Sequence, residues 1–352
     1  MPQNLFIRLC KIILILISVL LSSCSVTSYD KVYPTLVDGK YDSEFPYRSS
    51  SEELKKISQT VQRVTSTCFY RAYFFALEDS ITLEDIQNNP IMDLATETSY
   101  ANQSSSGTAT VIYSSNGRVA LLTCAHVVNY SDTVTSFFFN SDGTVTKFLD
   151  AVLVKEKETI FVAGFPGGSI LQLLAIDKDI DVALIGRRYT AFENYIFPVF
   201  NYPIGKAKEL QWGTFVYIFG YPINYQMITK ALVSSPNRDS RGSFLVDAVV
   251  NQGYSGGIVL AIKDGIPNFE LVGLVQWVPN DEENIIVPSP RKNNEPTNIM
   301  IPYNGELYIK KQTSLKYGIA RIISIELILK FLENNAANLK QEGYYLENFL
   351  GK

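Results

Sequence analysis

The chain has 352 residues, of which 46% are hydrophobic and 12% aromatic. This composition excludes a disordered protein and is sufficient for a substantial core. The formal net charge of −4 at pH 7 gives no basic footprint, so we expect no nucleic-acid partner.

The first segment has the pattern of an export signal. Arg8 and Lys11 precede an apolar run over residues 12–21, which is too short to favour a membrane-spanning helix. The run ends in the letters LSSC at residues 21–24, which resemble the lipobox of bacterial lipoproteins. By that resemblance, residues 1–23 are a removable signal peptide, and Cys24 carries lipid that holds the protein on a membrane of the bacterial cell envelope, facing the periplasm or the outside. An ordinary signal peptide with a cysteine nearby is the alternative.

A polar stretch follows at residues 24–50, with scattered Pro and Gly and no sustained period. We predict that it is a tether between the lipid and a folded domain over residues 51–340. Residues 341–352 are then a C-terminal tail.

The domain consists mostly of short β-rich runs separated by turn signals. Asn116-Gly117 lies between two such runs and predicts a hairpin. This pattern favours an all-β sandwich or barrel. The exception is SIELILKFLENNAANL, residues 324–339, whose apolar spacing predicts a helix.

The chain has a single histidine, His126, which follows the apolar run VALLT at residues 119–123. A lone histidine is usually structural, but any Ser–His pair in this chain must use it as the base. Asp177, Asp179 and Asp181 are candidates for the acid that orients the imidazole. Only Asp181 directly precedes the apolar run VALI, so we predict that Asp181 is this acid and that the other two are solvated loop charges.

Residues 251–257, NQGYSGG, supply a candidate nucleophile, Ser255. A serine hydroxyl is a poor nucleophile unless a base activates it. The backbone N–H groups of Gly253 and Ser255 are suited to bind a developing oxyanion, since glycine allows the unusual backbone needed there. The alternative is a serine in an ordinary glycine turn.

Taken in order, TCAHVV, DIDVALI and GYSGG resemble the trypsin-like serine peptidases, most closely their bacterial HtrA-like branch. The segments SSSGTATVIYSSNGRVALLT, VYIFGYP and FLVDAVVNQ also resemble that branch, so the resemblance covers about residues 105–335. It implies an all-β fold of two six-stranded antiparallel β-barrels with a C-terminal helix.

The same resemblance implies a serine endopeptidase that forms an acyl-enzyme on protein or peptide substrates. His126 would be the general base, Asp181 its orienting acid, Ser255 the nucleophile, and the amides of Gly253 and Ser255 the oxyanion hole. Neither a cofactor nor a metal ion is implied. A catalytically silent trypsin-like fold that acts as a binding module at the envelope is the alternative.

The chain also departs from the family pattern. Tyr254 precedes the serine where many animal members have an Asp that pairs with a newly cut N-terminus, so we do not expect activation by N-terminal trimming. We expect no PDZ-like module after the peptidase domain.

The family pattern places the floor of the substrate pocket six residues before the nucleophile, at Val249. A valine floor offers a cationic side chain no partner, so we predict cleavage after small or medium aliphatic residues. The alternative is that Val249 is a core strand residue and that loops form the pocket.

Two cysteines, Cys68 and Cys124, lie within the domain. Export would permit a disulfide between them, and two buried thiols are the alternative.

Overall fold

The structure is a computed structural model of the chain, and it describes residues 37–140, 144–166, 170–190, 195, 197–277, 280–288, 307–315 and 318–351. The predicted signal peptide and the predicted lipid site, Cys24, lie outside these residues. Among the described residues, no helix combines the length and the apolar content needed to cross a membrane.

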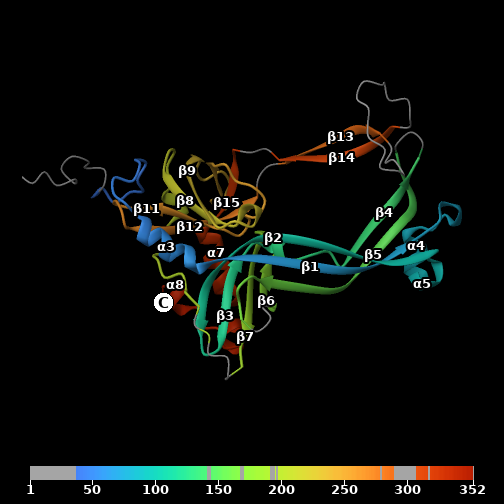
Figure 1. Ribbon diagram of the computed structural model, residues 1–352, viewed down its shortest axis with the longest axis horizontal. Helices are drawn as coiled ribbons and strands as arrows, with labels where there is room; N and C mark the ends of the chain where they lie inside the picture. The colour runs from blue at the N-terminus through green and yellow to red at the C-terminus, as the bar shows by residue number, and fades with distance from the viewer. Residues whose placement is uncertain are drawn as a thin grey trace, which may run out of the picture.

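The first of two β-barrels is built from the N-terminal half of the chain (Figure 1). Its strands pair in the order β1-β2-β3-β7-β6-β5, pairing of β1 with β5 closes the ring, and β4 adds to β5 outside it. All of these pairings are antiparallel. The strands are β1 (Val61–Phe74), β2 (Glu97–Ser115), β3 (Arg118–Thr123), β4 (Thr133–Phe139), β5 (Val145–Val162), β6 (Ile170–Asp177) and β7 (Val182–Arg188).

A second closed barrel follows, with the strand order β10-β15-β12-β11-β8-β9. Its strands are β8 (Phe215–Gly220), β9 (Met227–Ser235), β10 (Phe244–Asp247), β11 (Ile258–Ile262), β12 (Phe269–Trp277) and β15 (Ala320–Ser324). Between β12 and β15, the strands β13 (Asn280–Pro288) and β14 (Leu307–Leu315) form a separate two-stranded ribbon. The predicted fold of two six-stranded antiparallel barrels is therefore confirmed.

Local signals in the sequence fix several of these elements. Asn116 and Gly117 both have positive φ, 50° and 68°, as a two-residue turn that matches the twist of its strands requires, and they join β2 to β3. The predicted C-terminal helix is α7 (Ile325–Gln341), which starts directly after Ser324 at the end of β15. Its buried side chains, including Ile328 and Phe331, join the core shared by the barrels.

Four strands, in the order β2-β1-β5-β4, continue beyond the first barrel as an arm (Figure 1). The helices α4 (Leu83–Asn88) and α5 (Ile91–Leu94) lie at this arm. A second, smaller core around Tyr73, Phe75, Leu149 and Val152 packs there, separate from the core of the barrels.

Residues 37–50 of the predicted tether are described, and part of this segment packs on the second barrel. Tyr41 is buried, and its hydroxyl donates to Glu270 and accepts from the Lys206 N–H. Asp42 is also buried and accepts from the Gly265 N–H at 3.0 Å. The domain boundaries at residues 23, 50 and 340 stay predictions.

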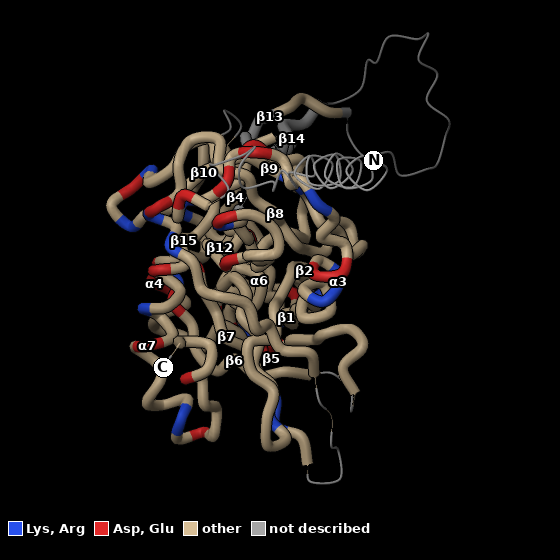
Figure 2. Tube along the Cα trace, turned by 90° about the vertical axis from the view of Figure 1, so that its left-hand side faces the viewer, with Lys and Arg blue, Asp and Glu red and all other residues tan. Residues whose placement is uncertain are grey.

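Charged residues of both signs are interspersed around the outside of the molecule (Figure 2). The chain around α6 (Ala125–Val128), where the barrels approach each other, carries no Lys, Arg, Asp or Glu. This uncharged stretch carries the single histidine.

Candidate active site

A cleft of about 640 Å³ contains both His126 and Ser255. Strand β2 contributes Ser104, Ser105 and Ser106 from the first barrel. The other lining residues are His126, Tyr221, Ile223, Asn224, Asn251, Gln252, Gly253, Tyr254, Ser255 and Val275. The cleft therefore lies between the two barrels.

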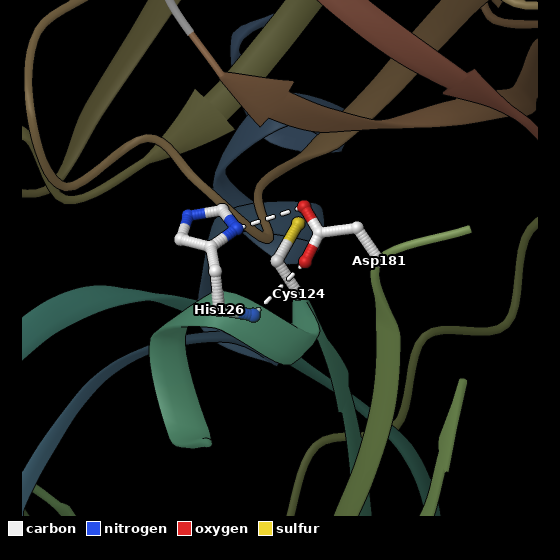
Figure 3. Close-up of side chains that lie close together, drawn as sticks. All are labelled: Cys124, His126 and Asp181. Carbon is white, nitrogen blue, oxygen red and sulfur yellow. Dashed lines mark hydrogen bonds and ion pairs between the residues drawn. The ribbon is translucent and has the colours of Figure 1, made fainter. Parts of the chain in front are cut away.

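His126 is held by a two-point contact with Asp181 (Figure 3). Asp181 Oδ2 lies 2.8 Å from His126 Nδ1, and Asp181 Oδ1 accepts from the His126 backbone N–H at 2.9 Å. The Asp181 carboxylate fixes the tautomer with the proton on Nδ1, which leaves Nε2 able to accept a proton. In Figure 3 this second nitrogen lies on the side of the ring away from Asp181.

The chain delivers Asp181 to this position through a tight turn before β7. Asp181 has φ of 62°, a left-handed conformation that Asp tolerates better than most residues, and its carbonyl accepts from the Ala125 N–H at 3.2 Å. Asp177 instead accepts from the backbone N–H groups of residues 179 and 180, and Asp179 is exposed. Only Asp181 of the three reaches the histidine.

The Ser255 loop contains a glycine, Gly253, whose backbone conformation and surroundings exclude other residues. Gly253 has φ of 106°, and a Cβ there would lie 2.3 Å from the Tyr221 carbonyl oxygen, so glycine is required. Within the described part of the chain, the N–H groups of Gly253 and Ser255 donate to no other residue. Both residues line the cleft, which leaves two donors for an oxyanion.

The Ser255 side chain and His126 form no hydrogen bond with each other among the described contacts. Such bonds are often long in unliganded enzymes and shorten when substrate binds. The structure thus brings His126, Gly253 and Ser255 to one cleft, and Asp181 fixes the orientation of His126 there.

Thr108 is a functional residue that the sequence-based analysis did not single out. It is fully buried in β2, its N–H donates to the Ser255 carbonyl at 2.8 Å, and its hydroxyl donates to the Gly253 carbonyl at 2.6 Å. The same hydroxyl accepts from the Tyr221 N–H at 3.0 Å. One residue of the first barrel therefore positions the nucleophile loop of the second. In the sequence, Thr108 directly follows Gly107 within the segment SSSGTATVIYSSNGRVALLT. The family resemblance of that segment is the one feature from which its role could have been predicted.

Comparison with known proteins identifies this arrangement. Residues 107–274 match a family model described as "Trypsin-like peptidase domain". The fold is trypsin-like. The matched range includes His126, Asp181 and Ser255, so these three residues lie inside the part of the chain that is similar to this family.

Two solved structures are also similar to this chain. One is a crystal structure of the serine endoprotease from Yersinia pestis, with 18% sequence identity, coverage of 83% of this chain and 67% of that chain, and a TM-score of 0.38. The other is a crystal structure of Deg5, with 16% identity, coverage of 65% of this chain and 87% of that chain, and a TM-score of 0.35. No curated protein matches the chain.

Tyr254 of the trypsin-like domain points into the core, where it fixes the residue that precedes Ser255. Its side chain is 1% exposed, and its hydroxyl forms a hydrogen bond with Thr229 of β9. A Cβ at Gly220 would lie 2.5 Å from the Tyr254 ring. The ring therefore occupies the space that a side chain at position 220 would need. The hydroxyl pair of Tyr254 and Thr229 therefore anchors the loop that carries Ser255 to strand β9.

Cys124 adds a thiol beside the His126–Asp181 pair (Figure 3). Its Sγ lies 3.1 Å from the Val275 carbonyl oxygen, and donor atoms of Cys124, His126 and Asp181 all lie within 4.8 Å of one another. Burial, and then the negative charge of Asp181, raise the pKa of the Cys124 thiol. The contact with Val275 makes Cys124 a hydrogen-bonded link between the end of β3 and strand β12 of the second barrel. Cys68 and Cys124 are both free buried thiols.

The cleft of the trypsin-like domain does not include Val249. Its side chain is 69% exposed and is absent from the cleft lining. Strand β10 ends at Asp247, so Val249 lies beyond the sheet, where strand alternation no longer sets the direction of a side chain. Its assignment as the pocket floor finds no support in this geometry.

Proposed function

We propose that the protein is a serine endopeptidase that hydrolyses peptide bonds through an acyl-enzyme intermediate. The two-point contact of His126 with Asp181, in the cleft that also contains Ser255, carries this proposal. The match to the trypsin-like peptidase domain supports the same class of activity and protein or peptide substrates.

Each residue has a defined role in this reaction. His126 Nε2 removes the proton from Ser255 Oγ as that oxygen attacks the carbonyl carbon, and later gives the proton to the leaving amine. Asp181 keeps the imidazole in the required tautomer and stabilises the imidazolium. The N–H groups of Gly253 and Ser255 bind the oxyanion, and loss of one such donor typically lowers the rate by about 10²–10³-fold.

A fluorophosphonate probe tests the proposal, because it labels only an activated serine. We expect the wild-type protein to be labelled, and Ser255→Ala and His126→Ala to show neither labelling nor peptide hydrolysis. Asp179→Asn serves as the matched control, since Asp179 is exposed and does not contact His126, and it should be labelled like the wild type. A folded His126→Ala variant with wild-type labelling would exclude His126 as the base.

A catalytically silent trypsin-like fold that binds partners at the envelope is the second candidate. It predicts that the hydrogen bond between Ser255 and His126 does not form when substrate binds, whereas the peptidase function requires it to form. An unlabelled but folded wild-type protein would support this candidate.

The cleft lining suggests the kind of residue that precedes the cut. Among its described residues there is no Asp, Glu, Lys or Arg, and an unpaired buried charge would cost several kcal/mol. The proposed substrates therefore have an uncharged residue before the scissile bond, and small or medium aliphatic side chains fit beside Val275. Peptide-library profiling tests this, and a dominant preference for Arg or Lys would contradict it.

The proposed location is the bacterial cell envelope, with lipid on Cys24 as the anchor. Support comes from the sequence of residues 1–24 alone. Metabolic labelling with an alkyne fatty acid should mark the wild type and not Cys24→Ser. Equal labelling of both proteins would exclude this cysteine as the lipid site.

A further inference from the structure

The part of β2 that leads from the arm to the cleft has only one strand neighbour. Residues 97–110 of β2 pair with β1 in unbroken register, whereas pairing with β3 begins only at Thr110. The other edge of β2 therefore has no neighbouring strand along residues 97–109, and its backbone groups are free up to Ser106 within the described part of the chain.

The direction of the free backbone groups follows from Thr108. Its N–H points away from β1, because it donates to the Ser255 carbonyl. In an antiparallel strand without a bulge, residues two apart face the same neighbour. The free edge therefore presents the N–H and C=O groups of Thr98, Tyr100, Asn102, Ser104 and Ser106.

None of these backbone groups has a hydrogen-bond partner on that edge among the described residues. The segment TSYANQSSS, residues 98–106, contains no Lys, Pro, Asp, Glu or Arg, and its register shows no bulge. Natural proteins use such residues and bulges to protect exposed edges from pairing with another strand. This edge lacks all of these protections.

The free edge is continuous with the active-site cleft. Ser104, Ser105 and Ser106 line the cleft together with His126 and Ser255, and Gly107 is so close to the nucleophile loop that a Cβ there would lie 2.8 Å from the Ser255 carbonyl oxygen. From Thr98 to Ser106 an extended strand spans about 26 Å, at about 3.3 Å per residue. An extended chain leaving the cleft can therefore continue along β2 without a break.

We propose that this edge, residues 98–106 of β2, is a docking site for extended, unfolded polypeptide substrate, which adds to the sheet as a further strand. The proposal rests on the proposed peptidase function for the identity of the occupant. Main-chain hydrogen bonds provide the affinity in such strand addition, and the uncharged side chains of the edge impose little selection on the bound sequence. Unfolded chains can bind in this way, whereas a folded protein offers no free strand of this length.

The test compares two substitutions at Asn102, whose side chain is exposed and whose backbone N–H faces the free edge. Asn102→Pro removes the outward N–H, and proline is tolerated on the open side of an edge strand. Asn102→Ala removes the side chain and keeps the N–H, so it is the matched control. Both are made in Ser255→Ala, so that bound peptide is not cut and binding is measured independently of catalysis.

The probes are uncharged peptides of Ser, Thr and Val that carry fluorescein. Fluorescence anisotropy measures their binding to each protein. One peptide has about 14 residues, enough to fill the cleft and the edge, and one has about five. Loss of one main-chain hydrogen bond should raise the Kd of the long peptide about 3- to 10-fold in Asn102→Pro, with no change in Asn102→Ala. The Kd of the short peptide should be equal in all three proteins. On the protein without an Asn102 substitution, N-methylation of alternate residues of the long peptide should weaken its binding similarly.

Several results would overturn the proposal. An equal Kd of the long peptide in all three proteins, no measurable binding of that peptide, or an equal loss in both Asn102 variants would each do so. Concentration-dependent dimerisation that Asn102→Pro abolishes would show that a second copy of the chain occupies the edge. Absence of fluorophosphonate labelling in the wild type would instead count against the proposed function and leave these binding results valid.

Discussion

At the scale of single residues, Thr108 is not a reacting group, but its hydrogen bonds hold the Ser255 loop in place. Its hydroxyl donates to the Gly253 carbonyl and accepts from the Tyr221 N–H, so it orients the loop from the opposite barrel. Thr108→Val keeps the shape of the side chain but leaves two buried backbone groups without their partner, which costs about 1–3 kcal/mol for each group. We expect kcat/KM and the labelling rate to fall at least about tenfold, and Thr108→Ser to restore most of the loss. A Thr108→Val protein with unchanged labelling would remove Thr108 from the positioning machinery.

The hydroxyl pair of Tyr254 and Thr229 makes a second prediction at this scale. Tyr254→Phe keeps the ring that packs against Gly220 and removes the hydrogen bond, so we expect kcat to fall several-fold with little change in KM. Thr229→Val should have the same effect, and the double variant should be no worse than either single variant, because one interaction is lost in all three. Strictly additive losses would show that the pair does not act as a unit.

Single residues also show where sequence-based prediction reaches its limit. The contact of His126 with Asp181 and the shared cleft of His126 and Ser255 agree with what local signatures predict. These signatures are one histidine in the chain, one aspartate directly before an apolar strand, and one serine among glycines. Val249 could not be placed, since its side-chain direction depends on how the chain leaves β10. The link from Cys124 to Val275 joins residues of different barrels, and no local pattern encodes it.

At the scale of elements, the arm has its own small core and should behave as a separate unit of stability. Leu149 is fully buried in this second core, and Leu149→Ala should cost about 2–5 kcal/mol there. Because the cluster is separate from the core of the barrels, we expect faster hydrogen exchange in residues 76–96 and 144–155, with unchanged exchange in the barrels. Labelling of Ser255 should also be unchanged. Equal acceleration in both barrels would show that the arm and the barrels unfold together.

Most elements could be predicted from alternation, turn signals and helical spacing, as the Asn116-Gly117 hairpin and α7 show. The arm could not, because β1, β2 and β5 each run through barrel and arm as one strand. A strand pattern reports which face is buried and not which neighbour covers it. The free edge of β2 could not be predicted from the sequence for the same reason.

At the scale of the whole molecule, Asp42 couples the N-terminal segment to the second barrel and makes its stability depend on pH. Burial raises the pKa of Asp42 to about 6, above its ordinary value of 3.8. Among the described residues, its Oδ1 has no hydrogen-bond partner. A raised pKa in the folded state means that this group favours folding below its ordinary pKa and that the contribution is lost as the pH rises through 6.

An asparagine in place of Asp42 would carry no charge at any pH, so Asp42→Asn should be more stable than the wild type at pH 8, by at most about 3 kcal/mol. The difference should shrink at pH 5. Urea unfolding of both proteins at the two pH values measures it. A constant difference would show that the carboxyl group does not titrate in this range.

The bond between His126 and Asp181 has a further consequence because the chain contains no other histidine. His126 Nδ1 lies 2.8 Å from Asp181 Oδ2. The proton on this nitrogen belongs to the only imidazole in the protein without a tag, so its magnetic resonance signal is unique. Histidine enriched with nitrogen-15 in the ring alone would therefore give signals from His126 and from no other side chain. The chain thus carries a reporter whose chemical shift should follow inhibitor binding in the cleft, with no need to decide which histidine the signals come from.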